Sequence, residues 1–248
     1  MAIRNARMSL LFGLGLTGTA LLAACSGGSA PPPPDPAVAA KAAQEAKANK
    51  QLALYEQMRA SGSVDLAAAV GNELVAKYPD TAAAAQTQKT LDAVRTQGAQ
   101  KAQAQRLSRL WIYTATPEAG GTQYAAAIES KAPIKALDKR ARIRLVLRQH
   151  PKWGQSVYLL LDNATFDCRK GCATLPVRFD DAKAERMKAT IPPTGEPALF
   201  IDPDKEFIAK LQKAKTVAID VTIKGGGEQT ITFEVGGYNS DKMPNKPK

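Results

Sequence analysis

The stretch Thr216–Val235, TVAIDVTIKGGGEQTITFEV, decides how the second half of this 248-residue chain folds. In its first eight residues, apolar side chains occupy every second position, and this period of two is typical of a half-buried strand. Three consecutive glycines then allow a tight turn, after which Thr230–Val235 resumes the strand pattern. We therefore predict a β-hairpin over 216–235.

The residues around this hairpin predict a β domain over 110–238. Further strands are expected at 111–115, 124–129, 140–148, 156–161, 164–168, 173–179 and 198–201. One helix is expected at 203–214, with Asp202 as its N-cap, Pro203 at its first position, and Phe207 and Leu211 facing the core. The sheet should be mostly antiparallel, either a sandwich or one strongly curved sheet with the helix across an end. Residues 239–248 are expected to be a basic, disordered tail.

Residues 37–109 have a different composition, rich in Ala, Gln and Lys, which favours helices. We predict three helices, at 37–60, 64–78 and 81–108, the last started by Asp80 or Thr81. The predicted fold class is therefore α+β, in which a helical hairpin or spacer precedes the antiparallel β domain.

The segment Val64–Ala85 is similar to one helical hairpin of a tetratricopeptide-like repeat, including the corner Tyr78–Asp80. This resemblance implies protein binding in a groove. It covers only about one repeat, whereas about three stacked repeats make a stable solenoid. A spacer, a docking hairpin and a self-associating coiled coil therefore stay open as alternatives.

The N-terminus has the layout of an export signal. Arg4 and Arg7 precede an uncharged apolar stretch, 8–24, that is too short to span a membrane comfortably. It ends in Leu22-Ala23-Ala24-Cys25, which resembles the lipobox of bacterial lipoproteins. The alternative is an ordinary signal peptide that has a Cys near its end.

The lipobox resemblance implies a lipid anchor. It implies removal of residues 1–24, diacylation of Cys25 and acylation of the new amine, so that membrane lipid is the expected partner of this end. Ser26 stands where an Asp would favour the inner membrane, and so implies the outer membrane. Residues 25–36 then form a proline-rich tether, extended at about 3.1 Å per residue.

Cys168 and Cys172 are the two cysteines that remain once Cys25 is lipidated. They lie between two predicted strands, and an exported protein meets an oxidising compartment. We therefore predict a disulfide between them, across the tip of a hairpin. Metal binding is disfavoured because four ligands at suitable spacing are absent, and a redox-active pair because three residues, rather than two, separate the thiols.

Several short motifs of the second half form a pattern around these cysteines. They are Phe166–Cys168, Cys172, Val177–Asp181, Leu199–Ile201, Phe207, Leu211, Ala214–Lys215 and Phe233–Gly237. The pattern resembles an uncharacterised β-rich domain of proteobacterial envelope proteins and, more weakly, accessory lipoproteins of type VI secretion systems. Neither resemblance implies a catalytic residue.

Basic residues recur on the strand predicted at 140–148 and in the turn after it. Those that share one parity are Arg140, Arg142, Arg144, Arg148, His150 and Lys152. In an extended strand they would form a row, with near neighbours about 6.6 Å apart, that suits phosphates and carboxylates. Together with Trp153 this row is the candidate site for an anionic partner. The alternative is a solvated sheet face whose arginines pair with carboxylates.

The register of the following hairpin decides between these two interpretations. A three-residue turn at Lys152–Gly154 would place Arg144 opposite Asp162 and Arg148 opposite Tyr158. A four-residue turn would place Arg148 beside Val157.

Few residues favour catalysis. His150 is the only imidazole and precedes Pro151, where a role in the turn or simple exposure is expected. The acidic pairs Asp180–Asp181 and Asp202–Asp204 lack the geometry of a general acid and base. Gly225–Gly227 lacks the Lys-Ser/Thr and the helix of a phosphate loop. We predict no catalytic residue, no cofactor and no metal site.

The chain is basic, with 34 Lys and Arg against 23 Asp and Glu, and loss of Arg4 and Arg7 lowers its formal net charge from +11 to +9. We predict a non-enzymatic outer-membrane lipoprotein that faces the periplasm. Its β domain is expected to bind another envelope protein or an anionic envelope polymer, and not nucleic acid.

Two alternatives stay open for this function. One is a lipidated inhibitor or immunity protein against a cell-wall hydrolase, in which the loop Pro151–Gly154 would plug a cleft. The other is an accessory lipoprotein of a secretion system.

Overall fold

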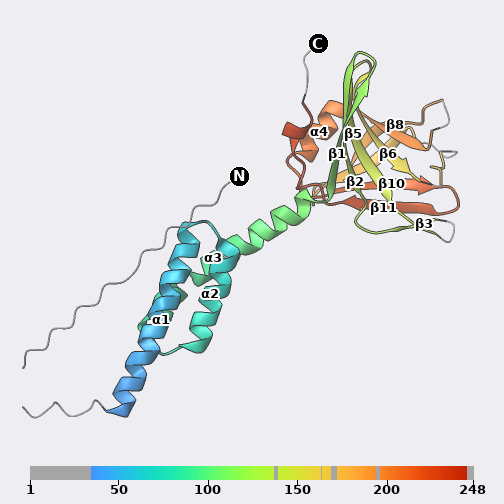
Figure 1. The fold of residues 1–248 in the computed structure, drawn as a ribbon. Helices are drawn as coiled ribbons and strands as arrows, with labels where there is room; N and C mark the ends of the chain where they lie inside the picture. Colours follow the sequence, from blue (N-terminus) through green and yellow to red (C-terminus); the bar gives the residue numbers. More distant parts are fainter. Residues whose placement is uncertain (1–34, 137–138, 163, 169–171, 194–195, 245–248) are drawn as a thin grey trace, which may run out of the picture. The chain divides into compact units, whose positions relative to one another are not determined.

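A computed structural model describes residues 35–136, 139–162, 164–168, 172–193 and 196–244 of the chain. The predicted signal peptide, Cys25 and most of the tether lie outside these described residues. Three α-helices come first in the sequence, followed by the strands of the β domain and one further α-helix (Figure 1). The predicted α+β fold class is therefore confirmed.

The first three helices are α1 (Pro36–Ala60), α2 (Val64–Lys77) and α3 (Ala82–Ser108), close to their predicted bounds. Of the two predicted starts of α3, Thr81 is the N-cap. Its hydroxyl oxygen accepts a hydrogen bond from the backbone amide of Ala84 at 3.2 Å. This bond satisfies one of the amides that have no acceptor within the first turn of a helix.

Small residues dominate the contacts between these helices. The buried residues are Ala48, Leu74, Ala83 and Ala84 in one cluster, and Tyr55, Ala67, Leu91 and Val94 in another. The Tyr55 hydroxyl shares a hydrogen bond of 2.9 Å with the hydroxyl of Thr90. Gly71 permits close approach, because a Cβ at this position would lie 2.9 Å from the Tyr55 ring and 2.7 Å from Leu91.

The β domain contains a nine-stranded sheet and a small two-stranded sheet. Its elements are β1 (Trp111–Glu118), β2 (Gly121–Glu129), β3 (Ile134–Ala136), β4 (Lys139–Ala141), β5 (Ile143–His150), β6 (Gly154–Leu161), β7 (Thr174–Phe179), β8 (Glu185–Thr190), β9 (Ala198–Asp202), α4 (Asp204–Leu211), β10 (Val217–Ile223) and β11 (Gly227–Phe233). The strand order across the large sheet is β1-β2-β5-β6-β9-β8-β7-β10-β11, and β3 pairs with β4. Every neighbouring pair is antiparallel, and the predicted hairpin is present as β10–β11.

The structure has two strands that are not predicted, and two predicted strands differ from it. β3 and β8 lie where no strand is predicted. The segment 164–168 is predicted as a strand, but only Phe166 pairs there, through an isolated bridge to Ile223. The strand predicted at 140–148 is divided at Arg142 into β4 and β5.

The predicted disulfide between Cys168 and Cys172 is present. Its predicted place at a hairpin tip is wrong, because β7 pairs with β8 and β10 and not with the segment before Cys168. The disulfide instead closes a loop that leads from the Phe166 bridge into β7.

The sheet curls so far that its two edge strands approach one another. The indole nitrogen of Trp111, on β1, donates to the carbonyl of Val235, just after β11, at 3.3 Å. The amide of Lys131 donates to the carbonyl of Thr232 on β11 at 2.7 Å. One strongly curved sheet, the second of the two predicted arrangements, is therefore present.

A single apolar core fills this curved sheet, and α4 contributes Phe207 and Leu211 to it as predicted. The N-cap prediction is wrong: Asp202 ends β9, and Pro203 occupies the N-cap position without a side-chain cap bond. Residues Ser240–Lys242 form a 3₁₀ turn, so the tail predicted as disordered begins with ordered structure.

Candidate functional site

The candidate basic residues lie on and around β5, whose register with β6 differs from both predicted registers. His150 pairs with Gly154, so the loop is Pro151–Trp153. Arg144 then lies opposite Leu160, and Arg148 lies opposite Ser156. The parity of the row is kept, because the odd-numbered Ile143, Leu145 and Leu147 face the core and leave the arginines on the outer face.

The continuous basic row that the sequence predicts is not formed. Arg140 lies on β4, and Arg142 lies between β4 and β5, so neither is part of the β5 strand. The Arg142 guanidinium donates to the backbone carbonyls of Ser130 and Lys131 and lies 3.7 Å from Glu129. It therefore binds the chain after β2 rather than continuing a row.

Arg144 is also neutralised within the domain. Its guanidinium lies 2.7 Å from a carboxylate oxygen of Asp162. This contact is diagonal across the β5–β6 pair, because the residue directly opposite Arg144 is Leu160. For Arg144, the interpretation as a paired residue on a solvated sheet face is correct.

Arg148 has a different environment. Its guanidinium carbon lies 5.6 Å from the ring centre of Trp153, 5.3 Å from that of Tyr158 and 5.9 Å from that of Phe200. Its Nε donates to the hydroxyl of Ser156 at 3.1 Å. Within the described parts of the chain, Arg148 has no ion pair with a carboxylate. Cation–π attraction to the three rings therefore holds the charge in place.

We call Arg148, Trp153, Tyr158 and Phe200 the Arg148 surface. Tyr158 and Phe200 are cross-strand partners on β6 and β9, with ring centres 5.0 Å apart. Burial raises the pKa of the Tyr158 hydroxyl, while the charges of Arg148 and Arg144 oppose this shift. The hydroxyl is therefore neutral at ordinary pH.

Trp153 is 66% exposed at the tip of the β5–β6 loop, and the ring of His150 packs against its indole. The two rings stack with centres 3.9 Å apart. His150 is only 6% exposed, and its Nδ1 accepts hydrogen bonds from the backbone amides of Lys152 at 3.0 Å and Trp153 at 3.2 Å. The predicted turn role of His150 is thus present, while Lys152 is exposed.

An apolar row continues from the Arg148 surface across the outer face. The registers place Ile112, Ala127, Val146, Tyr158 and Phe200 side by side on successive strands. Ile112, at the β1 end of this row, is 60% exposed. The outer face here is therefore more apolar than a solvated charged face.

The structure thus brings two of the sequence-predicted site residues into contact, Arg148 and Trp153, and leaves Lys152 exposed in the same loop. The sequence analysis missed Tyr158 and Phe200 as site residues. Tyr158 could have been found from the sequence, because its position in the alternating pattern of β6 places it on the same face of the sheet as Arg148. Phe200 is not adjacent in any local pattern, and only the β6–β9 pairing brings it to the site.

This arrangement suits recognition of an anion. A guanidinium has five N–H donors in a plane, and among the described residues Arg148 uses only its Nε, on the hydroxyl of Ser156. An anionic group that is attached to an apolar or planar body would contact the free donors and the Trp153 ring together. Among the residues that the structure describes, no cluster of three or more His, Cys, Asp or Glu is arranged to hold a metal ion.

None of the described helices is both long enough and apolar enough to cross a membrane. No protein family matches the sequence. No curated protein matches it either. A solved structure, invasion associated protein B from Bartonella henselae, is similar to 54% of this chain over 89% of its own length, with 15% sequence identity and a TM-score of 0.35.

Proposed function

We propose that this chain is a lipid-anchored protein of the bacterial outer membrane that faces the periplasm. Its β domain binds an anionic group of another envelope component through the Arg148 surface, without catalysis. The lipobox-like Leu22–Cys25 and the preceding apolar stretch support the anchor. The Cys168–Cys172 disulfide supports export, because disulfides persist in oxidising compartments.

One observation carries the binding part of the proposal. Arg142 and Arg144 are engaged by carbonyls and carboxylates, whereas Arg148 lies on three aromatic rings, one of which is the exposed Trp153. Its charge is held in position and remains available to an outside anion. Preorganisation of this kind lowers the entropy that is lost on binding.

The anchor is tested by labelling cells with a radioactive fatty acid. We expect the label on the native chain and its loss in Cys25→Ser, together with release of the variant from the outer-membrane fraction. Labelling of Cys25→Ser equal to that of the native chain would overturn the proposed anchor.

The binding role is tested by crosslinking in intact envelopes, followed by recovery of the chain and its partners. Arg148→Gln removes the charge and keeps much of the side-chain length, and should lower partner recovery at least tenfold. Arg144→Gln is the matched control, since it removes an equal charge from the same face of β5 but one that Asp162 already neutralises. Equal recovery with both variants would contradict the proposal.

A second function, inhibition of a cell-wall hydrolase, is favoured by the exposure of Trp153 at a loop tip. In that case Trp153→Ala should abolish protection of peptidoglycan against added hydrolase, while Arg148→Gln keeps it. Hydrolysis of peptidoglycan by the purified chain itself would overturn both binding functions.

A further inference from the structure

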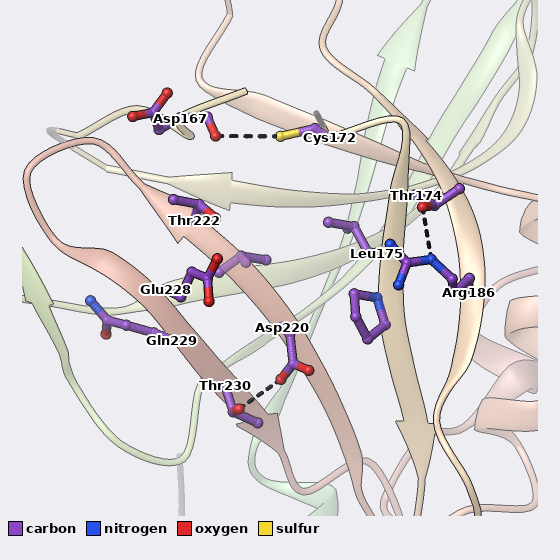
Figure 2. Close-up of a pocket in the computed structure, with 12 residues that line it drawn as sticks. Asp167, Cys172, Thr174, Leu175, Arg186, Asp220, Thr222, Glu228, Gln229 and Thr230 are labelled. Carbon is purple, nitrogen blue, oxygen red and sulfur yellow. Dashed lines mark hydrogen bonds between the residues drawn. The ribbon is translucent and has the colours of Figure 1, made fainter. Parts of the chain in front are cut away.

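A cleft of about 450 Å³ opens where β7 and β10 separate (Figure 2). These strands pair from Val217 to Ile219, and the next pair in this register would be Asp220 with Pro176. Proline has no N–H to donate to a ladder. The strands therefore part at Pro176, and the separation creates the cleft.

The far end of the cleft is closed by the segment before the disulfide. The amide of Asp167 donates to the carbonyl of Thr222 at 2.8 Å, and the amide of Lys224 donates to the carbonyl of Thr165 at 2.9 Å. The Cys168–Cys172 disulfide ties this segment to the chain that enters β7. The cleft is thus bounded at both ends by hydrogen bonds to β10.

Opposite charges line the two sides of the cleft. Asp220 and Glu228 lie on the β10–β11 hairpin, and Arg186 lies on β8 across the cleft (Figure 2). Pro176 pairs with Arg186 and would face Asp220, so it lies between the two charges. Because neighbouring strands are about 4.8 Å apart, the backbones that carry Asp220 and Arg186 are about 10 Å apart or more.

These charges do not neutralise one another. Asp220 accepts a hydrogen bond from the Thr230 hydroxyl at 2.6 Å, and the Arg186 Nε donates to the Thr174 hydroxyl at 3.2 Å. Within the described residues, no ion pair includes Asp220, Glu228 or Arg186.

We infer that this cleft binds a short zwitterionic peptide. The peptide ammonium would lie against Asp220 and Glu228, and its terminal carboxylate would lie against Arg186, which matches a carboxylate with two parallel donors. The apolar surface of Pro176 and Leu175 would contact the aliphatic part between the two ends. The cleft volume is within the range of small-ligand sites. This site is separate from the Arg148 surface.

Calorimetric titration of the full-length chain in detergent micelles tests the inference, with tri-alanine as the probe. Its N-acetyl derivative lacks the ammonium, and its C-terminal amide lacks the carboxylate. We expect tri-alanine to bind and each blocked peptide to bind at least tenfold more weakly. Failure of tri-alanine to bind, or equal binding of all three peptides, would overturn the inference.

Variants assign the two ends of the peptide. Arg186→Gln should weaken the binding of tri-alanine and abolish the difference in affinity between tri-alanine and its C-terminal amide. The double variant Asp220→Asn with Glu228→Gln should abolish the difference in affinity between tri-alanine and its N-acetyl form. Lys188→Gln is the matched control, because Lys188 lies two residues further along β8 and does not line the cleft. A loss of binding in Lys188→Gln as large as that in Arg186→Gln would contradict the assignment. Unchanged circular dichroism establishes that each variant is folded.

Discussion

The helical segment, α1 to α3, and the β domain have different kinds of core. Between the helices, half of the residues in the two buried clusters are alanines, and Gly71 is needed for close approach. In the β domain, branched aliphatic and aromatic side chains from almost every strand form one continuous cluster. The helices are therefore stabilised by close packing at a few contacts. The sheet is stabilised by the large apolar area that its side chains bury.

This difference has an energetic consequence. A fully buried Val, Leu, Ile or Phe side chain contributes about 1.5–3 kcal/mol, whereas a buried CH₂ contributes about 0.8 kcal/mol. An alanine-rich interface gains little per residue, and its helices need good caps and close packing. The two regions should accordingly respond to different substitutions, and four experiments test this, in order of decreasing expected effect.

Phe207→Ala should have the largest effect, and only on the β domain. Phe207 is fully buried, and its ring contacts that of Phe179, with centres 5.4 Å apart. Truncation removes buried area and leaves a cavity, so the free energy of unfolding should fall by about 3–5 kcal/mol. Urea unfolding followed by tryptophan fluorescence measures this, because Trp111 and Trp153 both lie in the β domain.

The same titration, followed by circular dichroism at a helix-sensitive wavelength, is the test of independence. Phe207→Leu is the control and should lose less, since it keeps most of the apolar volume. If the helical signal shifts as much as the fluorescence in Phe207→Ala, the two regions unfold as one unit and the comparison fails.

Gly71→Val should affect the helical segment instead. The new Cβ would lie 2.7 Å from the Leu91 side chain and 2.9 Å from the Tyr55 ring, so these two buried side chains must shift. We expect a loss of about 1–3 kcal/mol in the free energy of unfolding, read from the helical signal. Ala69→Val, at an exposed position of α2, carries only the cost of a β-branched residue in a helix, under about 0.7 kcal/mol. Equal losses in the two variants would refute the close-packing argument.

Thr81→Ala should remove the cap of α3. The hydroxyl that accepts from the Ala84 amide is lost, and the helical segment should be destabilised by about 1 kcal/mol. Thermal unfolding followed by circular dichroism at a helix-sensitive wavelength measures this loss. Thr81→Ser keeps the hydroxyl and should restore most of the lost stability. A melting temperature of Thr81→Ser as low as that of Thr81→Ala would assign the effect to packing and not to the cap.

Arg106→Gln should have the smallest effect, with a pH dependence of known sign. The hydrogen bond from Arg106 holds the pKa of Glu234 below its ordinary value of 4.5. A lowered pKa in the folded state adds stability above about pH 4.5, and this contribution is lost as the pH falls through the lowered value. At pH 7 the melting temperature of the variant should be slightly lower than that of the native chain. At low pH the two melting temperatures should be equal. A difference that grows on acidification would contradict this assignment.

Much of the fold follows from local patterns. The hairpin 216–235 is predictable because its alternation and its glycines are adjacent in sequence, and the helices because propensity and breaks are local. β8 escapes prediction since Glu185, Arg186 and Lys188 alternate only with Met187 and Ala189, a weak apolar signal. The segment 164–168 has strand-like residues but gains only the isolated bridge to Ile223.

The two sites differ in the same way. Arg148 and Trp153 belong to one hairpin, so the sequence predicts that they lie close together. The sequence does not predict which arginine of β5 forms an ion pair with a carboxylate. That choice depends on the register of β5 with β6, which places Asp162 within reach of Arg144 and three rings around Arg148. The cleft at Pro176 escaped prediction, because the strand that Pro176 fails to pair with lies some forty residues further along the chain.

The sequence by itself thus determined the α+β division, the main strands and helices, and the disulfide between Cys168 and Cys172, because propensity, period and cysteine count are local properties. The order of the strands, the curl of the sheet, the aromatic environment of Arg148 and the cleft beside Pro176 were decided only by the tertiary structure. They depend on which distant strands become neighbours and in which register. Both follow from burial of the whole core rather than from any single segment.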